Sequence, residues 1–185
     1  MARTESNHFE NGTLAPEFSL QDVVTGKTVN LQQLKGDNGT VIMFICNHCP
    51  FVVHVNTQLV KIANDYLKKG IGFIAINSND IENYPQDRPE LMKQVAANLS
   101  YPFPYLYDET QEVAKAYDAA CTPDFYVFDS YLKATYHGQL DHSRPGNGVK
   151  VTGEDLRNAL NALLNNQAPI DIQKPSIGCN IKWKK

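Results

Sequence analysis

The sequence has few cysteines and no long apolar run, and each absence excludes a class of protein. Its 185 residues include four cysteines, too few to build a fold from disulfides. No apolar run is long enough to span a bilayer, and the polar residues 1–11 contain no apolar core or cleavage site of a secretory signal. We therefore expect a cytoplasmic protein without a membrane partner.

Strongly basic stretches are also absent. Seventeen Lys and Arg residues oppose twenty Asp and Glu residues, and the basic ones are scattered without interleaved aromatic residues. This pattern does not favour nucleic acid as a partner. The length fits one compact domain with its own hydrophobic core.

The chain does contain alternating apolar strands and amphipathic helices. Residues 40–45 and 71–77 are continuous apolar runs typical of strands in a parallel sheet, and apolar residues between them recur at helical spacing from Pro50. Strand, helix and strand in this order predict a right-handed βαβ unit. Residues 14–20 with 28–31 predict an N-terminal β-hairpin, and residues 124–129 with 133–138 a second antiparallel pair.

These patterns predict an α/β fold with a central mixed β-sheet and helices on both faces. Further helices are expected at 88–99, at 110–119 and from 152, with a short strand at 103–107. We divide the chain into a flexible N-terminus (1–11), one domain (12–166) and an irregular C-terminal tail (167–185). Apolar residues in that tail predict that it packs on the domain.

Chemistry is expected at Cys46-Asn47-His48-Cys49, where the first buried strand meets the following helix. Two cysteines at this spacing can close a small disulfide, and the helix N-terminus favours a thiolate. His48, when protonated, places a cation beside that thiolate, which makes the disulfide more oxidising. The pattern predicts thiol–disulfide exchange without a cofactor.

The cysteine pair has two other interpretations that involve no thiol–disulfide exchange. Cys46 and Cys49 could be buried apolar residues, or they could bind zinc. Zinc needs a second pair of ligands, and the remaining His and Cys residues show no paired spacing, so we predict no metal. Those residues are His8, His54, Cys121, His137, His142 and Cys179.

Four segments stand out in order along the chain: residues 12–20, the cysteine pair, Thr122-Pro123 and the predicted strand after it. Together they resemble the peroxiredoxin-like (AhpC/TSA) and TlpA-type branch of the thioredoxin-like superfamily, with residues 12–20 matching its opening signature. The resemblance implies a thioredoxin-like fold, a cis peptide bond at Pro123, and substrate binding at Thr122 and Pro123. Within the branch, the C-N-H-C-P motif, the loop 141–147 and the segment 175–180 resemble one subgroup.

True peroxiredoxins resemble the chain at Cys49-Pro50, which makes Cys49 a candidate peroxidatic cysteine. By the same resemblance, a peroxide site has Thr or Ser three residues before that cysteine and an Arg near the cis-proline. The first position is Cys46 here, and residues 123–125 contain no Arg. Arg144 could reach the site from its loop.

The sequence does not settle which cysteine attacks first or what roles the other two cysteines have. In a thioredoxin-type arrangement Cys46 attacks and Cys49 resolves, which we favour, whereas Cys49 attacks in a peroxiredoxin-type arrangement. Cys121 next to Thr122 could be a third redox partner or a small buried residue, and Cys179 a distant resolving thiol or a packing residue.

We therefore predict a thiol–disulfide oxidoreductase. Its substrate would be a disulfide in a protein or small molecule, and its electron donor a dithiol protein or glutathione. The alternatives are a thiol peroxidase and a redox-sensing or binding module without turnover. The resemblance also makes a homodimer an expectation.

Overall fold

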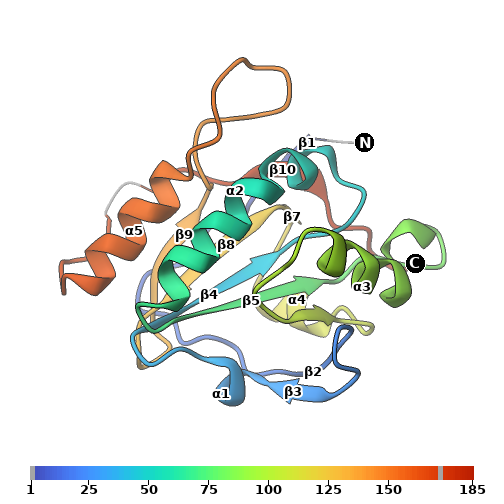
Figure 1. The fold of residues 1–185 in the computed structure, drawn as a ribbon, viewed down its shortest axis with the longest axis horizontal. Helices are drawn as coiled ribbons and strands as arrows, with labels where there is room; N and C mark the ends of the chain where they lie inside the picture. Colours follow the sequence, from blue (N-terminus) through green and yellow to red (C-terminus); the bar gives the residue numbers. More distant parts are fainter. Residues whose placement is uncertain (1–2, 171–172) are drawn as a thin grey trace.

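The computed structural model describes residues 3–170 and 173–185, and the remaining residues of the predicted flexible N-terminus and tail lie outside it. Its main element is a seven-stranded mixed sheet in the order β3-β2-β6-β5-β4-β8-β9 (Figure 1). These strands are β2 (Ser19–Asp22), β3 (Thr28–Asn30), β4 (Gly39–Phe44), β5 (Ile71–Asn77), β6 (Tyr105–Tyr107), β8 (Asp124–Phe128) and β9 (Ala134–Gly138).

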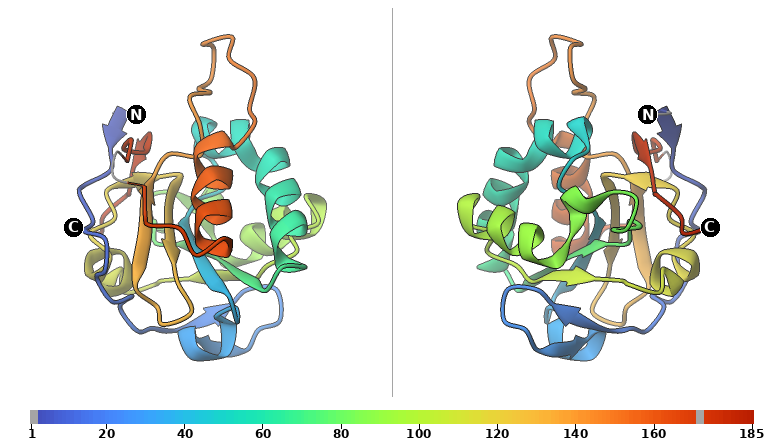
Figure 2. Two further views of the ribbon diagram at one scale, coloured as in Figure 1. Left: turned by 90° about the vertical axis from the view of Figure 1, so that its left-hand side faces the viewer. Right: turned by 90° about the vertical axis from the view of Figure 1, so that its right-hand side faces the viewer.

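Helices cover both faces of this sheet (Figure 2). One face packs against α2 (Pro50–Leu67), α3 (Pro89–Asn98) and α5 (Glu154–Leu164). The other face packs against α1 (Leu31–Leu34) and α4 (Glu112–Ala116). Because every residue of β4 and β5 is buried, these two strands form the centre of the core, as their continuous apolar sequence predicts.

Strand pairing follows the predicted pattern. β4 runs parallel to β5 and antiparallel to β8, so the sheet is mixed. An N-terminal hairpin is formed by β2 and β3, although its first strand is Ser19–Asp22 instead of the predicted 14–20. β8 and β9 form the predicted second pair. This arrangement places the end of β4, the start of α2 and the start of β8 beside one another.

A second sheet of three strands lies at this same end, in the order β1-β10-β7. It contains β1 (Arg3–Glu5), β7 (Cys121–Thr122) and β10 (Ile177–Asn180). Two sequence predictions are therefore corrected: residues 3–5 of the expected flexible N-terminus form a strand, and the tail is not irregular throughout. Both segments gain order from backbone pairing, which needs no apolar pattern in the sequence.

In the part of the chain that the structure describes, no helix combines the length and apolar character needed to cross a bilayer.

Candidate functional site

The cysteine pair lies where β4 ends and α2 begins. Cys46 follows the strand by two residues, and Cys49 is the N-cap residue of α2, with Pro50 at the first helical position. Proline fits there because its missing N–H would have no partner within the helix. Only 2% of Cys46 and 0% of Cys49 is exposed, so both thiols are covered.

The sulfur of Cys49 lies close to a carbonyl oxygen and to another sulfur. It lies 3.2 Å from the backbone carbonyl oxygen of Thr122, to which its thiol form can donate. Its Sγ is 2.9 Å from the Sγ of Cys179, within hydrogen-bond distance. Cys179 comes from β10, so the tail supplies a third thiol to the pair.

The pKa values of the two thiols of the motif are shifted in opposite directions. The hydrogen bond from Cys46 lowers the pKa of Cys49 to about 5, with further hydrogen bonds from Cys179 and from the backbone of Val52, although burial opposes the shift. The same hydrogen bond raises the pKa of Cys46, and burial and the negative charge of Asp87 raise it further. Both shifts favour a negative charge on Cys49 over one on Cys46.

Thr122, at the end of β7, and Pro123, just before β8, flank the pair. Their peptide bond is cis, as the resemblance implied. The hydroxyl oxygen of Thr122 lies 3.4 Å from the Sγ of Cys46. The backbone of Thr122, one of the two residues that the resemblance assigned to substrate binding, is already paired with Cys179 of β10.

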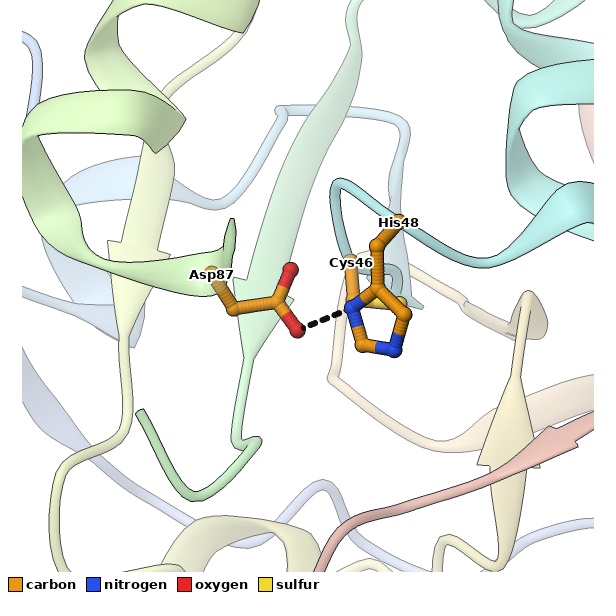
Figure 3. Close-up of side chains that lie close together, drawn as sticks. All are labelled: Cys46, His48 and Asp87. Atoms are coloured by element: carbon orange, nitrogen blue, oxygen red, sulfur yellow. Dashed lines mark ion pairs between the residues drawn. The ribbon is translucent and has the colours of Figure 1, made fainter. Parts of the chain in front are cut away.

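A buried carboxylate lies on the other side of the motif. The Nδ1 atom of His48 is 2.7 Å from Oδ2 of Asp87, which Figure 3 shows as a dashed line beside Cys46. The backbone N–H of Asn47 donates to Oδ1 of Asp87 at 2.7 Å, and the amide of Asn79 donates to Oδ2 at 2.8 Å. Burial alone would raise the pKa of Asp87, but the hydrogen bonds from His48 and Asn79 outweigh it and leave that pKa lowered.

The ring of Tyr84 completes the surroundings of His48. The two rings are stacked, with centroids 5.7 Å apart and planes 8° from parallel. Sequence reasoning missed both Tyr84 and Asp87, which lie in a polar loop without periodicity. The only signal was a loop rich in Asp and Asn directly after a buried strand.

The structure also brings together three potential metal ligands that the sequence did not pair. Single ligand atoms of Cys46, His48 and Asp87 all lie within 4.8 Å of one another. Both oxygens of Asp87 already accept hydrogen bonds from Asn47 and Asn79. We interpret the cluster as an electrostatic network around the thiols.

Comparison with known proteins assigns the chain to a family. The model of the AhpC/TSA family matches residues 11–137, which is more than half of the chain. The chain belongs to the AhpC/TSA family. Its architecture is the thioredoxin-like fold, and both findings confirm the resemblance seen in the sequence.

Two solved structures resemble the chain over nearly its full length. One is an uncharacterized conserved protein from Geobacillus kaustophilus, with 64% identity and a TM-score of 0.97 over 100% of this chain and 97% of that chain. The other is a hypothetical protein from Sinorhizobium meliloti 1021, with 46% identity and a TM-score of 0.95 over 98% of both chains.

A third relative carries a functional name. It is the thiol-disulfide oxidoreductase ResA of Halalkalibacterium halodurans, 25% identical over 121 residues. The match covers 65% of this chain and 63% of ResA, so the chain spans less than two thirds of that relative.

Two further residues predicted for the site of this AhpC/TSA member, Arg144 and Cys121, have other partners. The guanidinium of Arg144 donates to the backbone carbonyls of Asp141 and Ser143 and to the side chain of Gln139. It lines a small pocket that Pro123 also lines. The Sγ of Cys121 contacts the carbonyl oxygens of Pro123 and Ser176, and burial raises its pKa.

Proposed function

We propose that this AhpC/TSA protein is a thiol–disulfide oxidoreductase whose redox pair is Cys46 and Cys49. The observation that carries the proposal is the environment of Cys49. Its sulfur lies at the N-terminus of α2, where hydrogen bonds lower its pKa to about 5. A thiolate at neutral pH with a second thiol bonded to it is the minimal requirement for dithiol exchange.

In the proposed reaction, the thiolate of Cys49 attacks one sulfur of a substrate disulfide. The substrate S–S bond breaks, a mixed disulfide forms on Cys49, and the first substrate sulfur leaves as a thiolate. Cys46 then gives its proton to this thiolate and attacks the sulfur of Cys49, which releases the second substrate sulfur as a thiolate that takes a proton from water. Two electrons pass to the substrate, and the chain is left with a Cys46–Cys49 disulfide.

This order reverses the one we favoured from the sequence. Thioredoxin-like spacing alone favours Cys46 as the attacking thiol. However, the hydrogen bond with Cys49, burial and the charge of Asp87 all raise the pKa of Cys46, whereas hydrogen bonds lower the pKa of Cys49. The proposed electron donor is a dithiol protein or glutathione, and the proposed substrate is a disulfide in a protein or a small molecule.

The relative that bears the name thiol-disulfide oxidoreductase ResA supports the proposal. A direct test follows reduction of oxidised glutathione by the full-length protein, with dithiothreitol as the electron donor. We expect turnover in the wild type and in Cys121→Ser, and loss of turnover in Cys49→Ser and in the double variant Cys46→Ser with Cys179→Ser, because Cys179 also lies within reach of Cys49. Equal rates in all four proteins would reject the proposal.

A second candidate function is a thiol peroxidase, which the Cys49 thiolate followed by Pro50 favours. Against it, Cys46 replaces the expected Thr or Ser, and the guanidinium of Arg144 is bonded within its own loop. Hydrogen peroxide consumption with sulfenic acid on Cys49 would support this candidate. If peroxide is not consumed while oxidised glutathione is reduced, the peroxidase function is excluded.

A further inference from the structure

The tail places Cys179 in the redox site by backbone pairing. β10 pairs antiparallel with β7, and Cys179 lies opposite Thr122, the residue whose carbonyl oxygen contacts Cys49. On its other side, Cys179 lies opposite Arg3 of β1. Both neighbouring strands therefore hold β10 at the register that brings Cys179 to Cys49.

The close approach of β10 depends on a glycine next to Cys179. A Cβ atom on Gly178 would lie 1.8 Å from the carbonyl oxygen of Thr122. A residue with a side chain would therefore push β10 away from β7 and move Cys179 away from Cys49. Only glycine allows this contact.

β10 also occupies the backbone edge that an extended peptide would otherwise join. Addition of a strand to an exposed edge is a common mode of peptide recognition, and the edge of Thr122 borders both cysteines of the motif. The segment seated there carries a thiol 2.9 Å from Cys49. The tail therefore lies where a peptide substrate would bind, and it carries a thiol close enough to Cys49 for disulfide exchange.

We propose that Cys179 is a third redox thiol, which exchanges with the Cys46–Cys49 disulfide and forms a Cys49–Cys179 disulfide. This inference rests on the proposed function, because it needs the first disulfide to form. In the step, the sulfur of Cys179 attacks the sulfur of Cys49. The Cys46–Cys49 bond breaks, the Cys49–Cys179 bond forms, and Cys46 leaves with the proton that Cys179 gives up.

The step is an isomerisation, so no electron donor or acceptor is consumed. Burial raises the pKa of Cys179 to about 12, and the pKa of Cys46 is also raised. The proton therefore moves between two weakly acidic thiols, and neither disulfide is favoured by a strongly acidic leaving group. The result is an oxidised enzyme in which Cys46 is reduced again and the tail is joined to the site.

Mass spectrometry of the full-length protein tests the step. Diamide oxidises the reduced protein, and samples are quenched with an alkylating reagent at increasing times and digested with trypsin. Cys46 and Cys49 lie in the tryptic peptide 36–61, and Cys179 lies in the peptide 158–182 because Pro175 protects the bond after Lys174. A Cys46–Cys49 disulfide is therefore internal to one peptide, and a Cys49–Cys179 disulfide joins two.

We expect the internal disulfide to appear first and the joined peptides, with Cys46 alkylated, to rise as it falls. Cys121→Ser is the matched control, because it replaces another buried cysteine of the same sheet and should give the wild-type time course. Cys179→Ser should stop at the internal disulfide. Cys46→Ser should give the joined peptides directly, which keeps the test valid if Cys179→Ser fails to fold.

The outcomes separate this inference from the proposed function. An internal disulfide that persists in the wild type, with no joined peptides in Cys46→Ser, overturns the third thiol and leaves the proposed function standing. The absence of both disulfides overturns both proposals.

Discussion

The imidazole of His48 lies 2.7 Å from the carboxylate of Asp87, and 0% of the Asp87 side chain is exposed. The same carboxylate accepts the backbone N–H of Asn47. One buried charge therefore fixes both residues between the two cysteines of the motif. The hydrogen bond with Cys49 and burial raise the pKa of Cys46 most, and the charge of Asp87 raises it further. Asp87 therefore adds to the difference between the pKa values of the two thiols.

Asp87→Asn should destabilise the protein and reduce the difference between the pKa values of Cys46 and Cys49. The oxygen of the new amide can still accept one hydrogen bond, but its NH2 group faces the N–H groups of His48 and Asn79. We expect this to lower the free energy of unfolding by about 1–3 kcal/mol. The lowered pKa of Asp87 stabilises the fold above the ordinary carboxyl pKa, and this contribution is lost as pH falls through the lowered value. Urea unfolding should therefore show a difference from wild type that is present at neutral pH and shrinks in acid.

Asp37→Asn serves as the control for this substitution, because Asp37 is exposed. Its unfolding free energy should match that of the wild type at every pH. If Asp87→Asn behaved in the same way, Asp87 would not hold the motif.

The thiolate absorbance of the reduced protein should titrate with a midpoint at about pH 5, the pKa of Cys49. Cys49→Ser should remove this step, and Cys121→Ser should keep it. The lowered pKa also stabilises the folded state above the ordinary thiol pKa, and the stabilisation is lost as pH falls through about 5. A step that survives in Cys49→Ser and disappears in Cys46→Ser would assign the thiolate to Cys46 instead.

Gly178→Ala should uncover the cysteine pair. The added Cβ forces β10 away from the carbonyl oxygen of Thr122, and the cysteines then react faster with an alkylating reagent. We expect an increase of about tenfold or more, equivalent to ~1.4 kcal/mol in the opening equilibrium. Glu5→Ala on β1, where the side chain is exposed, should leave the rate unchanged. Equal rates for the two variants would show that β10 does not cover the site.

Thr122→Val should slow the resolving step. The contact between the Thr122 hydroxyl and Cys46 lowers the pKa of Cys46, so its loss makes Cys46 a weaker acid. A hydrogen bond contributes about 0.5–1.5 kcal/mol, so resolution should slow by roughly two- to tenfold. With Cys179→Ser as the background, mass spectrometry of quenched samples should show more mixed disulfide on Cys49. No accumulation would mean that the hydroxyl does not assist Cys46.

The centre of the fold could be predicted from the sequence because burial leaves a strong local pattern. β4, α2 and β5 have apolar residues at strand and helix spacing, and the motif lies at their junction. β1 left no such signal, because Arg3, Thr4 and Glu5 are held by backbone pairing. Asp87 and Cys179 reach the site through long-range contacts, which a single sequence does not show.

The pairing of β1 with β10 also sets how the chain responds to tension. Because the strands are antiparallel and Arg3 lies opposite Cys179, both ends of the chain leave the ladder from the same end. A force applied to the two ends would first detach residues 181–185. It would then break the hydrogen bonds between β1 and β10 one after another, beginning at Cys179. Mechanical load on the termini would therefore reach the thiol site before it reached the central sheet.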